Sequence, residues 1–392
     1  MNVILFDDPE IRIKLFPFTL TRPLAAIRIG ILTIAEKWEK HLNVPVSFQT
    51  ENYLQKKFPL KSESDNLLIN GAVCPDQILK DTIVALPQGY FLVKDALLVA
   101  ARNPSGPMTK TNVIEYPNNI TAIDEVWKIF KENAQQIKHD FKLVTEGRKS
   151  QPIEDKHTKT YNEQDIFLEE GVYIRSAILN AETGPIYLGK NSIVQEGSMI
   201  RGGLALCEGG HLNMGAKMRG DITVGPHCKV GGEVSNSVLF AYSNKAHDGY
   251  LGNAVIGEWC NLGAGTSASN LKNNYALIKL WNHASGELKT TGLQFCGLMM
   301  GDHSKSAINT MFNTATVVGV SSNVFGDGLP PSFVPSFSWG GGNGLITYRF
   351  DKAIETAARV MGRRDLDVNL VDKDILEHIY KTTTQARTWE KS

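Results

Sequence analysis

The sequence lacks a net charge, because 41 Lys and Arg side chains balance 41 Asp and Glu side chains over 392 residues. Without an overall field it has no general attraction for nucleic acid or an anionic membrane, so an anionic ligand requires a local group of cations. It also lacks an apolar run near the roughly 18 residues of a membrane span. The apolar start of MNVILFDDPEIRIK meets Asp7 and Asp8 too early for a secretory signal.

Cysteine is also scarce, and the spacing of the five cysteines fits neither a disulfide framework nor a paired zinc motif. Cys207 lies near His211, and His227 is next to Cys228, but no four-ligand spacing emerges. We therefore expect a reducing compartment, the cytoplasm, and no zinc site.

The first 145 residues alternate strand-like and helix-like segments, as α/β domains do. Strands are predicted at 3–6, 44–48 and 67–69, and residues 89–102 are predicted to form two strands around a turn at Lys94 and Asp95. Thr33 and Glu36 have the spacing of a capping box, which predicts a helix over 33–42. Apolar residues at helical spacing predict a second helix over 121–141, and the polar stretch 146–165 is a predicted linker.

From residue 166 the period changes, and aliphatic residues recur every sixth position in segments such as VGPHCK, IGEWCN and LGAGTS. A six-residue period is typical of a coil in which each piece is one short strand plus a corner, with three pieces closing a triangular turn. We therefore predict a parallel β-helix over 166–335. The tail, 336–392, is predicted to form a helical cap, because terminal coils require covering.

One segment of this β-helix, HDGYLGNAVIGEWCNLGAGTSASN at 247–270, resembles the acetyltransferase domain of the GlmU family. That family joins an N-acetylglucosamine-1-phosphate uridylyltransferase to a glucosamine-1-phosphate acetyltransferase. Its β-helix is left-handed and carries a histidine, a nearby Tyr-Leu-Gly, an Asn-(Ile/Leu)-Gly-Ala-Gly-Thr segment and a later asparagine. The segment LTRPLAAIRIGILTIAEKW resembles a divergent Bacteroidetes-type branch of sugar nucleotidyltransferases.

The resemblance implies a role for each matching residue. His247 would be the general base that takes a proton from the sugar amine, since neutral histidine exists near pH 7. Tyr250, Asn261 and Asn270 would contact the sugar or the acetyl group, and Ala264 would contact the thioester end of acetyl-CoA. Each residue also has a purely structural interpretation. His247 would then be a hydrogen-bonded polar residue without a catalytic role, and Asn261 and Asn270 would be corner residues, because asparagine tolerates left-handed backbone angles.

The resemblance also assigns the sugar phosphate to Arg219, which alternatively pairs with Asp221. The family has a second cation two residues after a glutamate, but here Glu233 is followed by Ser235. Lys245, Lys272 or a residue of a neighbouring subunit is a candidate to replace it. The acceptor sugar therefore stays open.

The predicted nucleotide site is less well marked, because the chain lacks the glycine-rich loop that cradles phosphates in sugar nucleotidylyltransferases. Arg22, Arg28 and Lys37 form a small cationic set that would serve the nucleotide, and Asp76 would approach Mg²⁺. Alternatively, the two arginines are structural partners for the acidic residues at 7, 8 and 10.

Three functions follow from these patterns. The first is acetyl-CoA-dependent acetylation of an amino-sugar 1-phosphate, coupled to nucleotidylyl transfer that uses Mg²⁺. The second is a nucleotidylyltransferase for UTP or dTTP whose β-helix only oligomerises or regulates. The third is a non-catalytic β-helix scaffold. The expected partners are sugar phosphates and nucleotides, with neither nucleic acid nor membrane, and the resemblance implies a homotrimer.

Overall fold

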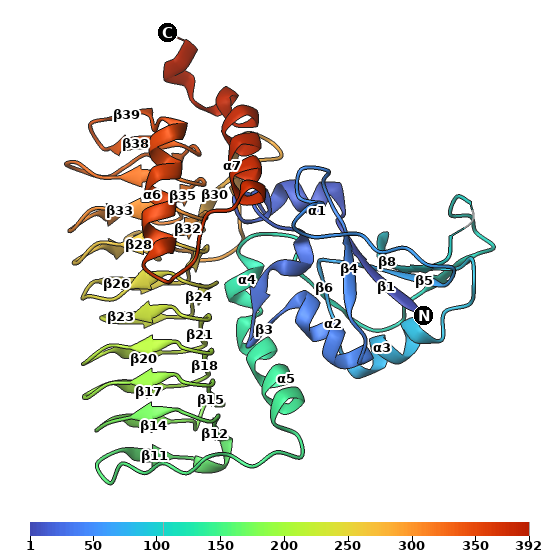
Figure 1. Cartoon of the computed structure of the whole chain (residues 1–392), viewed down its shortest axis with the longest axis horizontal. Helices are drawn as coiled ribbons and strands as arrows, with labels where there is room; N and C mark the ends of the chain where they lie inside the picture. Colours follow the sequence, from blue (N-terminus) through green and yellow to red (C-terminus); the bar gives the residue numbers. More distant parts are fainter. Residues whose placement is uncertain (105, 392) are drawn as a thin grey trace.

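The N-terminal region is an α/β domain in the computed structural model, which describes residues 1–104 and 106–391 (Figure 1). Its six-stranded sheet has the order β4-β1-β5-β8-β7-β9 and is parallel around β1 and antiparallel at β5-β8-β7. The strands are β1 (Asn2–Phe6), β4 (Val46–Gln49), β5 (Asn66–Asn70), β7 (Phe91–Lys94), β8 (Leu97–Arg102) and β9 (Val113–Glu115). Short pairs join β2 (Arg28–Ile29) to β3 (Leu32–Thr33) and β6 (Val73–Cys74) to β10 (Thr121–Ala122). The helices are α1 (Pro9–Lys14), α2 (Ile34–Leu42), α3 (Gln77–Val84), α4 (Lys128–Lys131) and α5 (Asn133–Thr145).

The capping-box prediction is confirmed at the start of α2, where the Thr33 side chain and the Glu36 side chain bond to each other's backbone N–H. The single helix predicted over 121–141 is wrong. Thr121 and Ala122 instead form β10, because they pair with β6, and the helical part is split into α4 and α5 at Glu132. Asn133, the first residue of α5, is buried, and its side-chain oxygen accepts a bond of 2.7 Å from the Gly30 N–H, so tertiary contacts fix where this helix begins.

Residues 159–347 contain the predicted left-handed parallel β-helix, whose strands of mostly two or three residues stack into three sheets (Figure 1). Sheet 1 contains β11 (Lys159–Tyr161), β14 (Ile178–Asn180), β17 (Met199–Arg201), β20 (Lys217–Arg219), β23 (Glu233–Ser235), β26 (Tyr250–Gly252), β29 (Ser267–Ala268) and β34 (Met311–Phe312). Sheet 2 contains β12 (Ile166–Leu168), β15 (Ile186–Leu188), β18 (Leu204–Leu206), β21 (Ile222–Val224), β24 (Val238–Leu239), β27 (Val255–Ile256), β32 (Met299–Met300), β35 (Val317–Val318) and β37 (Phe333–Val334).

Sheet 3 completes each coil and leads into the next strand of sheet 1. It contains β13 (Tyr173–Ile174), β16 (Ile193–Val194), β19 (His211–Leu212), β22 (Lys229–Val230), β25 (Asn244–Lys245), β28 (Asn261–Leu262), β33 (Lys305–Ser306), β36 (Asn323–Val324), β38 (Ser338–Gly341) and the antiparallel β39 (Gly344–Thr347). The β-helix therefore extends beyond the predicted limits of 166 and 335, since β11 lies in the predicted linker and pairs with β14.

The six-residue period arises because one aliphatic side chain per strand points into the coil. Leu206, Leu212, Met218, Val224 and Val230 are all at most 2% exposed and belong to one core cluster. Each stacks on its counterparts in the coils above and below, so the apolar column continues through the β-helix.

The N-terminal domain packs on sheet 2, which is therefore buried on both faces (Figure 1). A hairpin of β30 (Lys279–Asn282) and β31 (Glu287–Thr290) leaves the coil after β29 and adds Ile278 and Leu280 to the same core as the N-terminal domain. The two parts of the chain consequently share one hydrophobic core.

The predicted C-terminal helices are α6 (Phe350–Gly362) and α7 (Leu370–Thr382). They lie beside the last coils, where Ala353 and Ile375 pack with Val320 and Phe337 (Figure 1). α7 also meets the N-terminal domain, since Asp372 accepts a bond of 2.8 Å from Lys57.

Among the described residues, no helix has the length and apolar character required to cross a membrane.

Candidate functional site

One corner of the β-helix is two residues shorter than those around it, and this creates a hollow. Inward residues are six positions apart from Leu212 to Met218, but only four apart from Val230 to Val234. The short corner is Gly231–Gly232. An added Cβ on Gly231 would meet the carbonyl oxygen of Ala246 at 2.3 Å, so glycine is required for the coil above to approach this closely.

The hollow has a volume of about 470 Å³, and we call it the notch. Asn213 and Met214 line it on one side, and Ala246, His247 and Asp248 line it on the other, with His211 and Lys229 on sheet 3. The side chain of His247 is exposed at the edge of the notch. Burial and the nearby Lys229 ammonium lower the pKa of His211, which keeps that imidazole neutral at pH 7.

The corner that carries His247 is held from below and from above. Asn213 reaches past the shortened coil and donates a bond of 2.8 Å to the carbonyl oxygen of Ala246. Gly265 N–H donates a bond of 3.0 Å to the carbonyl oxygen of Asp248, and Asn309 N–H bonds to the carbonyl oxygen of Ala264 at 2.7 Å. Ala264 therefore lies on the same corner as His247, one coil further along.

A second group of the predicted residues meets on sheet 1. The Tyr250 hydroxyl lies 3.0 Å from both the Ser235 hydroxyl and the side-chain nitrogen of Asn270. Asn270 is 9% exposed and also bonds to Asn253 at 2.8 Å. Arg219 is in register with Ser235, and its guanidinium is 3.6 Å from Glu233, not paired with Asp221.

A cation that the sequence analysis missed lies beside Arg219. Arg201 is in register with Arg219 on the preceding coil, and both are exposed on sheet 1. Their spacing of 18 residues, one full coil, was the available signal. Lys245, a candidate replacement for the second cation, is instead 1% exposed and bonds to backbone carbonyls inside the coil.

Asn261 is separated from this group, because it is exposed on sheet 3 and in register with Asn244. The structure therefore brings His247 and Ala264 together on the corner between sheets 3 and 1, Arg219, Tyr250 and Asn270 together on sheet 1, and leaves Asn261 on sheet 3.

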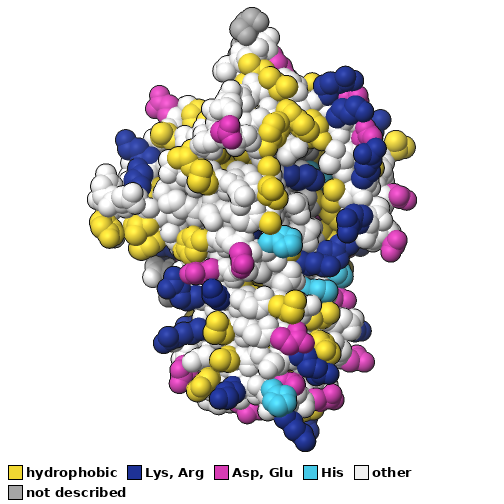
Figure 2. Space-filling view, turned by 90° about the vertical axis from the view of Figure 1, so that its left-hand side faces the viewer, with side chains coloured by type: hydrophobic (Ala, Val, Ile, Leu, Met, Phe, Trp, Pro, Cys, Tyr) yellow, Lys and Arg dark blue, Asp and Glu magenta, His cyan; other side chains and the backbone are white. Residues whose placement is uncertain are grey.

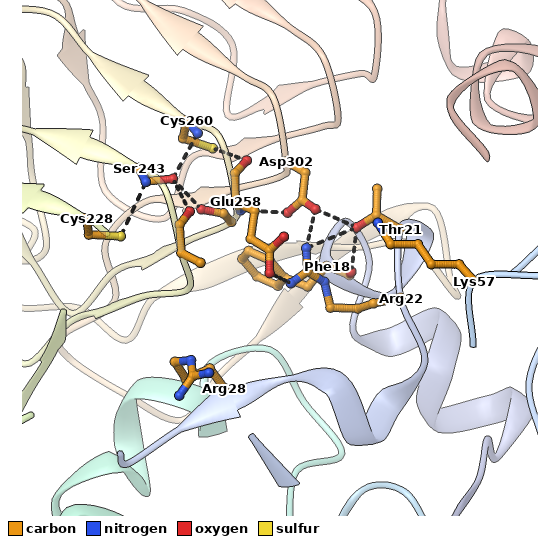
Figure 3. A network of polar contacts seen from close by, with 12 residues as sticks. Phe18, Thr21, Arg22, Arg28, Lys57, Cys228, Ser243, Glu258, Cys260 and Asp302 are labelled. Carbon is orange, nitrogen blue, oxygen red and sulfur yellow. Dashed lines mark hydrogen bonds and ion pairs between the residues drawn. The ribbon is translucent and has the colours of Figure 1, made fainter. Parts of the chain in front are cut away.

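The cations predicted for a nucleotide all have protein partners. Arg22 is 5% exposed and contacts Glu258 at 2.9 Å and Asp302 more closely still (Figure 3). Arg28 stands apart from that network and pairs with Glu36 at 3.3 Å. Lys37 is 1% exposed, and its ammonium bonds to both carboxylate oxygens of Asp140.

The predicted Mg²⁺ ligand Asp76 is the N-cap of α3, where its carboxylate accepts a bond of 2.8 Å from the N–H of Leu79. In the part of the chain that the structure describes, no three His, Cys, Asp or Glu side chains gather in a metal-binding group. The cap bond uses one of the two carboxylate oxygens of Asp76. Mg²⁺ in nucleotide sites is usually held by one or two carboxylates together with waters and substrate phosphates, so the role of Asp76 as its ligand stays a prediction.

Comparisons with known proteins find one matching family model and several relatives that match parts of the chain. Residues 3–149 match the family model described as sugar nucleotidyl transferase. A bifunctional GlmU protein of Trichodesmium erythraeum is 39% identical over 79 residues, which are 20% of this chain and 16% of that one. A GlmU protein of Trichormus variabilis is 32% identical over 138 residues, covering 34% and 28% of the two chains.

An archaeal relative has a related description. The bifunctional sugar-1-phosphate nucleotidylyltransferase/acetyltransferase of Sulfurisphaera tokodaii is 29% identical over 93 residues, which are 24% of this chain and 23% of that one. The matched segments span less than a third of each of these three relatives.

Proposed function

We propose that this chain, a GlmU-like relative of the sugar nucleotidyl transferases, acetylates an amino-sugar 1-phosphate with acetyl-CoA. The observation that carries the proposal is the corner between sheets 3 and 1. His247 stands there at the edge of the notch, and the glycine-rich segment with Ala264 lies on the next coil. The proposal gives His247 the role of the base, the notch that of the acceptor site and the backbone at Ala264 that of the thioester site, and their positions on adjacent coils support it.

In the proposed reaction, the amine nitrogen attacks the thioester carbonyl carbon while His247 takes a proton from that nitrogen. The carbon–sulfur bond then breaks as the amide forms, and the imidazolium returns its proton to the leaving sulfur, giving the N-acetyl sugar and free CoA. Backbone N–H groups of the glycine-rich segment are suited to hold the negative oxygen of the intermediate.

The sugar phosphate is assigned to Arg219, with Arg201 as the second cation. Replacing either by methionine is expected to raise the KM for the sugar phosphate about 10-fold to 100-fold, since a hydrogen bond to a charged group contributes about 1.5–3 kcal/mol. The kcat should change little. Steady-state kinetics of both variants test this, with Lys190→Met, an exposed lysine on another corner, as the control.

An unchanged KM in Arg201→Met together with a raised KM in Arg219→Met would remove Arg201 from the phosphate site. An unchanged KM in both variants would show that the sugar phosphate does not bind at these two arginines of sheet 1.

We further propose that the N-terminal domain couples the product to a nucleotide, and the match of residues 3–149 supports this. The alternative remains a nucleotidylyltransferase whose β-helix only oligomerises or regulates. It would use the cations Arg22, Arg28 and Lys37, all of which have carboxylate partners. Asp76 would hold Mg²⁺ there through the carboxylate oxygen that does not cap α3, and the ion would neutralise charge on the nucleotide phosphates.

A homotrimer is proposed because the β-helix exposes apolar side chains on the side away from the N-terminal domain, where histidines and both charges also reach the surface (Figure 2). Along sheet 1 and its corner with sheet 3 these are Tyr161, Ile178, Met199, Met214, Ile308 and Met311. A neighbouring subunit would cover them and enclose His247. Light scattering after size exclusion tests this, and a stable monomer of 43.2 kDa would contradict it.

The proposed activity is tested by measuring free CoA thiol when glucosamine-1-phosphate and other amino-sugar phosphates are added with acetyl-CoA. Pyrophosphate release from UTP or dTTP with a sugar 1-phosphate is measured in parallel. Thiol release supports acetyl transfer. Pyrophosphate release alone, with no thiol release from any acceptor, would favour the alternative.

A further inference from the structure

Lys245 occupies a position that is aliphatic in the coils above and below it. In β25, Asn244 faces outward and Lys245 faces inward, in register with Val230 of the preceding coil and opposite Leu262 of the next. The side chain is 1% exposed. A buried ammonium that has no charged partner lowers the stability of the folded protein. An aliphatic residue at this position would continue the apolar core, so packing of the β-helix does not explain why a lysine is present.

The Lys245 ammonium bonds to the backbone and to no carboxylate side chain within the described part of the chain. It donates to the carbonyl oxygens of Gly231 at 3.4 Å, Asp248 at 3.3 Å and, most closely, His247. Two of these three carbonyls belong to the corner that presents the proposed base. The third lies in the shortened coil that forms the floor of the notch.

The same corner receives two bonds from other coils, to Ala246 from Asn213 and to Asp248 from Gly265. Three successive carbonyls, those of residues 246–248, are therefore all held. The carbonyl of His247 has its bond from Lys245. Lys245 thus completes a set of contacts that fixes the backbone on which the imidazole stands. A base in acyl transfer works only when it is placed within hydrogen-bond reach of the reacting amine.

We propose that Lys245 is a positioning residue for acetyl transfer, which fixes the backbone at His247 and Asp248 from inside the coil and thereby places the His247 imidazole. The inference rests on the proposed function of His247. It departs from the sequence-based idea that Lys245 replaces the second phosphate cation, because the ammonium is enclosed by the coil.

The test compares wild type with Lys245→Met, which keeps the length of the side chain and removes the charge. The kcat for acetyl transfer is expected to fall about 10-fold to 100-fold, the scale of a small misplacement at a reacting centre. The KM values for acetyl-CoA and the sugar phosphate should change little. Lys305→Met is the matched control, because Lys305 is a half-buried lysine that donates to a corner carbonyl, that of His303, at a different corner. It should keep the wild-type kcat.

A second measurement is independent of activity. Hydrogen exchange of the peptide 244–252 should become faster in Lys245→Met, while peptides from other coils keep their wild-type rates. If the wild-type protein acetylates no acceptor, the proposed function fails, but this exchange result still decides whether Lys245 holds the corner. Unchanged exchange or an unchanged kcat in Lys245→Met would overturn the inference.

The thermal stability of Lys245→Met distinguishes a positioning role of Lys245 from a role in stabilising the fold. Burial lowers the pKa of Lys245 to about 8, and the Asp248 carboxylate acts in the opposite direction. The neighbouring inward positions of the coil are the aliphatic residues Val230, Leu239, Leu251 and Leu262, and His247 and Asp248 are the titratable groups on its corner. Because an unfolded lysine has a pKa of about 10.4, the folded protein binds this proton less tightly than the unfolded chain does.

The lysine charge is therefore destabilising below about pH 8, and this cost disappears as the pH rises to about 10.4. Lys245→Met is expected to melt above wild type at pH 7, with the difference shrinking toward pH 10. A variant that loses kcat while gaining stability supports positioning. A variant that melts below wild type at pH 7 would assign Lys245 to the fold and overturn the inference.

Discussion

Replacing Arg22 by methionine is expected to lower the free energy of unfolding by about 3–5 kcal/mol, the cost of removing one partner from a buried ion pair. Arg22 lies in the N-terminal domain, and its partners Asp302 and Glu258 lie in the β-helix (Figure 3). Without Arg22, the carboxylate of Asp302, which is 3% exposed, would remain charged and buried between the two parts of the chain.

The network around this pair increases the expected effect. Asp302 also accepts bonds from the Thr21 hydroxyl at 2.8 Å and from the Glu258 N–H at 2.9 Å. These contacts keep the carboxylate in place when Arg22 is lost, so it cannot turn out to solvent. A change of 3–5 kcal/mol is a large part of the roughly 5–15 kcal/mol that stabilises a typical protein.

Denaturant unfolding of the full chain tests this prediction. Arg349→Met is the control, because Arg349 is an exposed arginine paired with Asp351 at 2.7 Å and should change stability by no more than about 0.5 kcal/mol. Asp302→Asn in the Arg22→Met background should restore part of the loss, since the buried charge is then removed. If Arg22→Met is as stable as wild type but releases no pyrophosphate, Arg22 serves a nucleotide and the structural role is wrong.

The Arg22 pair also shows where sequence-based prediction ends. From the sequence, Arg22 was placed in a cationic set for a nucleotide, but its carboxylate partners lie 236 and 280 positions away in the other part of the chain. The alternative partners considered from the sequence, the acidic residues at 7, 8 and 10, are all close to Arg22 along the chain. Lys37 and Asp140 are a second example of a distant ion pair, because they are 103 positions apart and come together only in the folded chain, where α5 lies against α2.

The β-helix was predictable because its physical cause is periodic. One aliphatic residue in six must point inward, and glycine or a small residue must follow at the corner, so the pattern is visible without any partner. The notch was not predicted. It results from a missing pair of residues between Val230 and Val234, and a search for matches at six finds the repeats and passes over the interruption.

The sequence predicted the individual residues of the candidate site, but it did not predict how these residues are arranged in space. His247 and Ala264 meet on one corner, but Asn261 lies on sheet 3, away from Tyr250 and Asn270 on sheet 1. Arg201 was missed because its relation to Arg219 depends on the length of a whole coil. The inward lysine at 245 was seen as a cation, and only the register of β25 shows that it points into the core.

Replacing His247 by alanine is expected to lower the kcat for acetyl transfer by about 10²-fold to 10⁴-fold, the usual contribution of general acid–base catalysis. The side chain is exposed, so the fold should keep its wild-type melting temperature. His157→Ala is the matched control, since His157 is an exposed histidine near the first coil and far along the chain from the notch. It should leave the kcat unchanged.

The deciding measurement is therefore the rate of CoA thiol release from acetyl-CoA with glucosamine-1-phosphate, for wild type, His247→Ala and His157→Ala side by side. We predict turnover by wild type and His157→Ala, and a loss of at least about two orders of magnitude in His247→Ala. Turnover by His247→Ala at the wild-type rate would contradict the assignment of the base. No thiol release by wild type with any amino-sugar phosphate would contradict the acetyltransferase itself.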